Sequence, residues 1–152
     1  MYFNVEKTVL GLFVGLFLTL SLVSQAKAYG TTDDREIIWV SEKEKALLLL
    51  EMRAFLNASQ KILEANLAGD MEAVEEAARL VGVSLFKDTP EAIHEKLPIT
   101  FNMIGPRAYM GFESIVNEAV GGGDMMIIFS QLAELQKNCV ACHSLFRFKV
   151  KE

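Results

Sequence analysis

The 152-residue sequence is short of several features that metal sites and large sheets require. It has two cysteines and two histidines, and the only histidine outside the cysteine-containing segment is His94, so a zinc site of Cys and His ligands lacks donors. No segment alternates between polar and apolar residues long enough to predict a strand, and no internal repeat occurs. There is no basic tract suited to phosphate backbones, which argues against nucleic acid as a partner.

The N-terminus has the pattern of an export signal. Lys7 precedes an almost wholly apolar run at residues 8–23, and Ala26 and Ala28 form the small-x-small pattern of a cleavage site before Tyr29. The 16 residues of that run reach about 24 Å as a helix, short of a hydrocarbon core of roughly 30 Å. We therefore expect residues 1–28 to be a cleaved signal peptide and the protein to be periplasmic, with an uncleaved membrane anchor as the alternative.

Cleavage after Ala28 would leave a mildly acidic mature chain. It removes two lysines and one glutamate, which leaves 13 basic and 19 acidic residues and a formal charge of −6. Residues 29–40 are polar and then mixed, and they predict a leader segment rather than a packed element.

The remaining sequence predicts helices joined by short connections. Ser41 and Glu44 form a capping box before a helix over residues 42–68, which Gly69 ends. Further helices are predicted over residues 71–81, briefly over 90–96, over about 98–120, and after Asp124 to Phe146. Pro106 interrupts the third of these patterns and predicts a kink or a short break near Gly105. Residues 83–97 otherwise predict a connector. We expect an all-α fold, an antiparallel four-helix bundle over residues 29–152.

Helical spacing also predicts which residues face the core. On the first helix Leu49, Met52, Leu56 and Leu63 form one apolar stripe, with Phe55 and Ile62 beside it, and we expect this stripe to face inward. His94 lies in a charged segment and is expected to be a solvated surface residue.

The final predicted helix carries the motif CVACH at residues 139–143. Cys-x-x-Cys-His is the attachment signature of c-type haem: two thiols one helical turn apart reach the two vinyl groups, and the histidine supplies an axial ligand to iron. We therefore predict one covalently attached haem c on Cys139 and Cys142, with His143 as the proximal ligand.

Three other interpretations of the two cysteines remain open. A thiol–disulfide oxidoreductase also uses Cys-x-x-Cys, but normally at a helix N-terminus after a strand, where the helix dipole lowers the thiol pKa. A zinc site lacks ligands, and a structural disulfide is disfavoured because adjacent turns of one helix rarely meet disulfide geometry.

The stretch CVACHSLFR at residues 139–147 resembles the haem-binding end of the class II c-type cytochromes, the cytochrome c prime family. The resemblance is sharp over the last dozen residues and extends in outline over the mature chain. It implies a four-helix bundle with the motif on the last helix, and it implies cofactor-binding roles for Phe146, three residues after the histidine, and Arg147, four after it. It also implies that an apolar residue midway along the first helix leaves the iron five-coordinate, whereas a methionine there gives a low-spin iron.

Met52 lies near that midpoint, although counting back from Gly69 in the family pattern reaches Arg53. Met52 is thus the candidate sixth ligand. The other candidate methionines are Met103, Met110, Met125 and Met126. We expect a non-enzymatic periplasmic cytochrome that carries single electrons between redox protein partners, in a homodimer as among relatives. The alternative is a five-coordinate haem protein that binds nitric oxide or carbon monoxide.

Overall fold

The computed structural model describes residues 32–88 and 90–151. The chain divides into one unit of residues 1–34 and another of residues 35–152, and the elements below belong to the second. The expected signal peptide and its cleavage site lie outside the described residues. None of the helices within residues 32–88 and 90–151 has the length and apolar character needed to span a bilayer.

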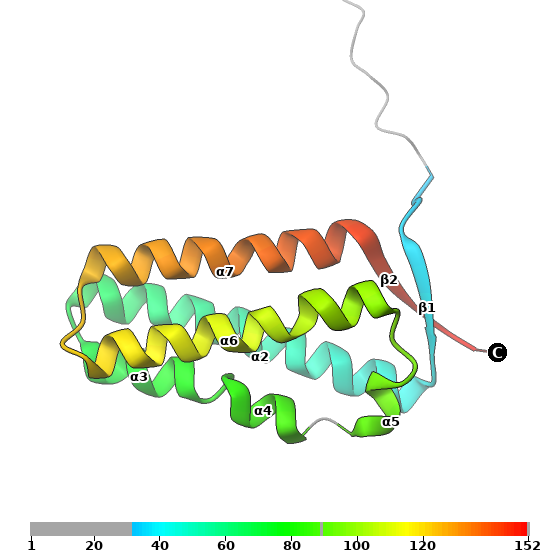
Figure 1. Cartoon of the computed structure of the whole chain (residues 1–152), viewed down its shortest axis with the longest axis horizontal. Coiled ribbons are helices and arrows are strands. Elements are labelled where there is room, and N and C mark those ends of the chain that lie inside the picture. Colours follow the sequence, from blue (N-terminus) through cyan, green and yellow to red (C-terminus); the bar gives the residue numbers. More distant parts are fainter. Residues whose placement is uncertain (1–31, 89, 152) are drawn as a thin grey trace, which may run out of the picture. The chain divides into compact units, whose positions relative to one another are not determined.

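The described part of the chain is mostly helical, as the sequence predicts, with a short sheet added (Figure 1). In chain order the elements are β1 (Glu36–Val40), α2 (Glu42–Ala68), α3 (Met71–Arg79), α4 (Val83–Asp88), α5 (Glu91–His94), α6 (Ile99–Val120), α7 (Met125–Leu145) and β2 (Phe146–Val150). The prediction that no strand occurs was wrong, because β1 and β2 pair in parallel. The predicted connector after Gly82 was wrong in part, because it contains α4.

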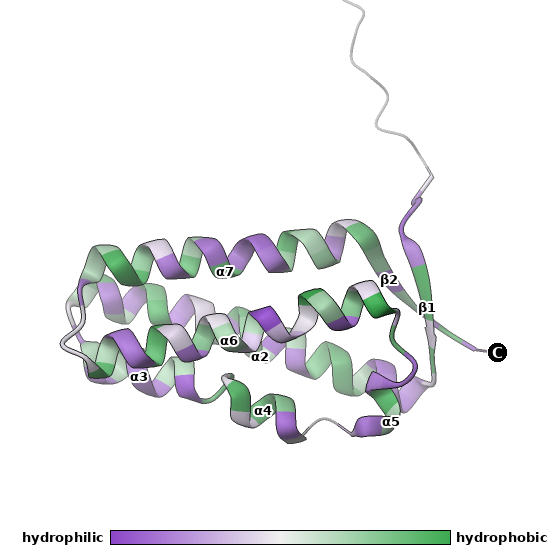
Figure 2. Ribbon diagram, in the orientation of Figure 1, coloured by the Kyte–Doolittle hydropathy of each residue, from purple (hydrophilic) through white to green (hydrophobic). Residues whose placement is uncertain are grey.

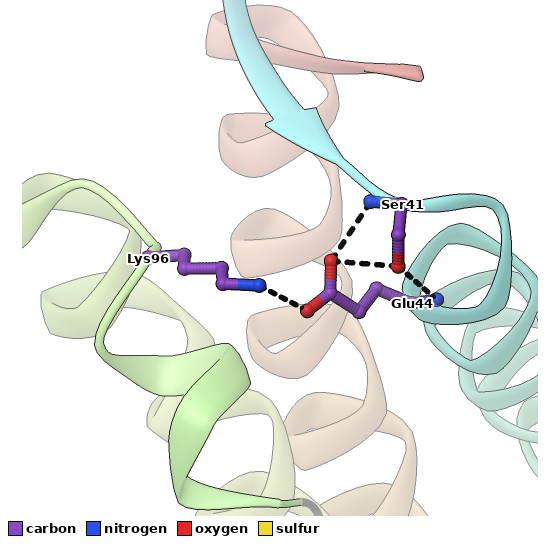
Figure 3. A network of polar contacts seen from close by, with 3 residues as sticks. All are labelled: Ser41, Glu44 and Lys96. Carbon is purple, nitrogen blue, oxygen red and sulfur yellow. Dashed lines mark hydrogen bonds and ion pairs between the residues drawn. The ribbon is translucent and has the colours of Figure 1, made fainter. Parts of the chain in front are cut away.

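Both ends of α2 form as predicted. The Ser41 hydroxyl accepts a hydrogen bond from the Glu44 amide, and the Glu44 carboxylate accepts one from the Ser41 amide at 2.8 Å (Figure 3). Lys96 donates to the other Glu44 oxygen at 2.5 Å and ties the start of α2 to the segment after α5. These contacts lower the pKa of Glu44 from 4.5 to about 2, chiefly through Lys96. At the far end Gly69 adopts φ 74°, a conformation that costs glycine little.

The predicted apolar stripe of α2 lies only in part against the packed core. Leu49, Met52 and Leu56 line a cavity between the helices, whereas Leu63 is 36% exposed and lies outside that lining. The buried residues of α2 are Leu48, Phe55, Ala58, Ile62 and Asn66. Of these, Leu48, Phe55 and Ile62 each lie one position before a leucine of the predicted stripe. The sequence could not distinguish the two faces, because residues 47–50 are all leucine and leave the phase of the helix ambiguous.

The long helices pack side by side around one apolar core. Contacts join α2 to α3, α3 to α6, α6 to α7, and α7 back to α2. The most deeply buried large side chains of this core include Ile62, Phe112, Ile115 and Ile128. Each such side chain contributes roughly 1.5–3 kcal/mol through the hydrophobic effect. Figure 2 shows apolar residues recurring along α2, α6 and α7.

Of the kink or short break predicted near Gly105, the break does not occur, because α6 continues through Pro106. At Gly111, farther along α6, a Cβ would lie 2.8 Å from Leu135 Cδ1, so the small side chain permits close packing against α7. The α6–α7 contact therefore places the helix with the two cysteines firmly against the core.

The parallel sheet closes one end of this unit. Glu36 pairs with Phe146 and Val40 with Val150, so the beginning and end of the unit lie side by side (Figure 1). Phe146, expected on the last helix, instead begins β2 with φ −127° and ψ 152°. A second apolar cluster forms here, separate from the helical core; its buried members are Ile38, Val40, Leu48, Ile93, Leu97 and Phe146.

Candidate functional site

A cavity of about 1090 Å³ lies beside the C-terminal half of α7. Its walls come from α2, α4, α5, α6 and α7, from Arg35 before β1, and from β2. In Figure 1 α7 lies on one side of the molecule and α4 and α5 on the opposite side, with α2 and α6 between them. The cavity therefore reaches between the long helices, and its size suits a large organic ligand.

The structure brings every sequence-predicted site residue to this cavity. Its lining includes Cys139, Cys142, His143, Phe146, Arg147 and Met52. The two cysteines are half-buried and His143 is exposed, all on the last two turns of α7. Met52 lies on α2, whereas the other five residues lie within residues 139–147, so folding and not sequence proximity brings Met52 to them.

The two cysteines are free thiols and form no disulfide in this structure. Burial raises the pKa of the Cys139 thiol. Burial also raises the pKa of the Cys142 thiol, and the neighbouring Cys139 adds to this effect. A redox-active Cys-x-x-Cys motif needs a lowered pKa at a helix N-terminus, whereas these thiols lie near the C-terminus of a 21-residue helix.

The wall opposite α7 is aromatic. The Phe86 ring lies 5.1 Å from the Tyr109 ring and 4.9 Å from the His94 ring, measured between centroids. The Tyr109 hydroxyl donates a hydrogen bond to the Glu51 carboxylate on α2. The prediction that His94 is a solvated surface residue was wrong: the packing of α5 leaves it half-buried, and it lines the cavity.

Met52 differs from the other candidate methionines in its position. It is half-buried, packs against the helical core and lines the cavity. Met103, Met110, Met125 and Met126 are exposed and lie outside the cavity lining. Arg53, the adjacent position in the register, also lines the cavity but is exposed.

Cationic side chains outnumber carboxylates around the cavity. Those of the lining are Arg35, Lys45, Arg53, Lys87 and Arg147, against Glu51 and Glu91. The protein as a whole has a net charge of −5, so this local excess of cations is specific to the cavity. An apolar ligand that carries carboxylates fits such a site, because guanidinium groups pair well with carboxylates.

Sequence reasoning missed two polar contributors, Arg35 and Glu51. Arg35 lies in the segment predicted to be an unpacked leader, and Glu51 is one of many charged residues on α2, so neither carried a local signal. Within residues 32–88 and 90–151, no group of three or more His, Cys, Asp or Glu side chains is arranged to hold a metal ion.

No protein-family model, curated protein or solved structure matches the chain. The case for function therefore rests on the motif and on the cavity.

Proposed function

We propose that this chain is a periplasmic monohaem cytochrome, similar to the class II c-type cytochromes, that carries single electrons between protein partners. One observation carries the proposal: Cys139, Cys142 and His143 line a large cavity together with Met52 from another helix. The thioether, the two thiols and the imidazole are the donor groups that a covalently attached haem with two axial ligands requires.

The residues of the cavity fit a haem group. The half-buried thiols of Cys139 and Cys142 would hold it covalently, and His143 would bind iron as the proximal ligand. Phe146 is buried beside the motif, and the Arg35 and Arg147 guanidinium groups offer partners for carboxylates. When bound, the haem supplies reversible one-electron chemistry at iron, with a potential set by its axial ligands and surroundings.

The proposal includes an antiparallel four-helix bundle formed by α2, α3, α6 and α7. It is supported by the continuous series of contacts among these helices. In such bundles, cofactor sites are built from side chains on facing helices, as here on α2 and α7.

Export and partners are parts of the same proposal. We propose that residues 1–28 are removed, so that N-terminal sequencing of protein from its native compartment begins at Tyr29; an intact Met1 in a membrane fraction would favour an anchor. The exposed leucines of α2 that lie outside the cavity lining, Leu47, Leu50, Leu63 and Leu67, offer an apolar surface for a second copy, which analytical ultracentrifugation of the purified protein tests.

The decisive experiment is expression in a host with working haem-attachment machinery. The protein should be coloured and should keep its haem after denaturation and acidic extraction. Variants Cys139→Ser and Cys142→Ser should each lose one thioether link, whereas Ser130→Ala, on an exposed position of the same helix, should behave as wild type. A colourless wild-type protein with two titratable thiols would contradict the proposal and favour the oxidoreductase interpretation.

A further inference from the structure

The junction between α7 and β2 leaves backbone carbonyls of the last helical turn that need hydrogen-bond donors. Helix α7 ends at Leu145, one turn after Cys142 and two residues after His143, and the chain turns at once into extended backbone. The Phe146 amide donates to the Cys142 carbonyl. The remaining carbonyls of the last turn need donors from outside the helix.

Arg35 supplies such donors from 108 residues away. Its Nη1 atom donates to the His143 carbonyl at 3.2 Å and to the Phe146 carbonyl at 3.4 Å. One guanidinium thus bridges the last turn of α7 and the first residue of β2. Its positive charge also lies at the negative end of the α7 dipole, where a cation is stabilising.

The sheet holds Arg35 in this position. Arg35 directly precedes β1, and the first pair of the sheet joins the next residue, Glu36, to Phe146. At the other end of the sheet the Lys151 amide donates to the Val40 carbonyl at 3.1 Å. Phe146 is buried in the apolar cluster, and its ring lies 5.5 Å from the Phe101 ring. The backbone of β1, which begins directly after Arg35, is therefore held at both ends of the strand.

We propose that Arg35 is a positioning residue for His143. By holding the His143 and Phe146 carbonyls, it fixes the turn from which the imidazole reaches the iron. Contacts to the residues around a ligand orient it and tune the metal, so this clamp acts on the site without touching the iron. Its charge beside the proximal turn also favours the reduced iron and raises the potential. This inference rests on the proposed haem attachment.

The test compares three variants of the haem-loaded protein. Arg35→Met removes both donors and the charge while keeping much of the length, and Arg35→Lys keeps the charge but not the planar fork. Arg107→Met is the control, because Arg107 is exposed on α6 and lies outside the cavity lining. Three properties are measured: the midpoint potential, the iron–histidine stretching frequency by resonance Raman, and amide hydrogen exchange of residues 146–150. Because the stretch is observed only in five-coordinate ferrous haem, the Raman spectra are recorded with each protein also carrying Met52→Leu, which removes the proposed sixth ligand.

We expect Arg35→Met to have a lower potential and a shifted iron–histidine frequency. Exchange in β2 should rise about ten-fold, as expected for loss of a charged hydrogen bond. Arg35→Lys should recover most of the potential but not the frequency or the exchange protection. Arg107→Met should match wild type in all three properties.

Two results would overturn the inference. Equal potentials and frequencies for Arg35→Met and Arg107→Met would show that Arg35 does not act on His143. Exchange that rises throughout the chain, rather than in β2, would show a general loss of stability instead of a local clamp. The haem content of the wild-type protein is measured first and separately. A wild-type protein without covalent haem would contradict the proposed function itself.

Discussion

Replacement of Met52 tests whether the proposed haem protein would transfer electrons or bind gases. Met52 is half-buried on α2 and lines the cavity that His143 shares. A thioether is neutral and soft, so it can be buried at low cost and still coordinate iron. If it does, the wild-type protein should be low-spin in both oxidation states and should bind carbon monoxide slowly.

Two variants separate ligation from packing. Met52→Leu removes the sulfur while nearly conserving volume, so the free energy of unfolding should fall by less than about 1.5 kcal/mol. Met52→Ala should cost about 1–2 kcal/mol, roughly half the usual range for a fully buried methionine, because the side chain is only half-buried. Both variants should nevertheless become high-spin and bind carbon monoxide readily.

The assay combines absorption spectra of both oxidation states, carbon monoxide binding by stopped flow, and denaturant unfolding. Met110→Leu is a matched control, because Met110 is exposed and lies outside the cavity lining. A wild-type protein that is already high-spin and binds carbon monoxide freely would refute the reasoning. Met52 would then be a packing residue, and gas binding would become the leading function.

Three further predictions concern the fold and the thiols. The pKa of Glu44 is lowered from 4.5 to about 2, so the contribution of its carboxylate to stability is complete above pH 4.5 and is lost as the pH falls toward 2. The difference in the free energy of unfolding between wild type and Glu44→Gln, measured in urea, should therefore shrink over that range of pH. A difference that stays constant would contradict this prediction. In haem-free protein, iodoacetamide should alkylate Cys139 and Cys142 faster only above the pH range of ordinary thiols, because burial raises the pKa of both thiols. An inflection of the alkylation rate below about pH 7.5 would instead favour an oxidoreductase. Ile62→Ala should lower the free energy of unfolding by about 2–5 kcal/mol. Leu67→Ala, on the exposed face of α2, should change it by about 0.5 kcal/mol or less. Similar losses of free energy in the two variants would mean that the inward face of α2 is assigned wrongly.

Local signals made the helix boundaries predictable. The start of α2 follows from the capping box at Ser41, its end from Gly69, and the start of α7 from Asp124, whose carboxylate accepts hydrogen bonds from the two amides of Met126 and Ile127. Each of these features acts within four residues. The CVACH motif is equally local, so its place on the last helix could also be predicted.

The strands could not be predicted in the same way, because they depend on distant partners. Phe146, Phe148 and Val150 alternate with charged residues, but five residues after a helix also fit a continuation of helical spacing. Their partner strand lies in a segment that sequence alone describes as a leader. Helix α4 was missed because it is only six residues long, which is too short for helical spacing to stand out in the sequence.

The position of His94 was a failure of a different kind. Its segment of the sequence is charged, but its ring lies 4.9 Å from the ring of Phe86 on α4, an element that was not predicted. The Met52 side chain lies at the cavity together with Leu49 and Leu56 of the predicted stripe, whereas Leu63 does not. Four consecutive leucines allow two helical phases, and only the packing of the other helices selects one.

The pairing of β1 with β2 also constrains the order of events during synthesis. Glu36 and Phe146 are separated by nearly the whole unit, and closing so long a loop is entropically costly until the intervening helices have packed. The sheet can therefore form only after residues 146–150 have emerged, when the CVACH segment has already been made. Until the sheet forms, no strand pairing restrains the segment that follows the two thiols, which would leave them accessible to the haem-attachment enzyme that the proposed function implies. A truncation that removes residues 146–152 would keep the whole motif yet leave that end permanently open, with β1 lacking its partner strand.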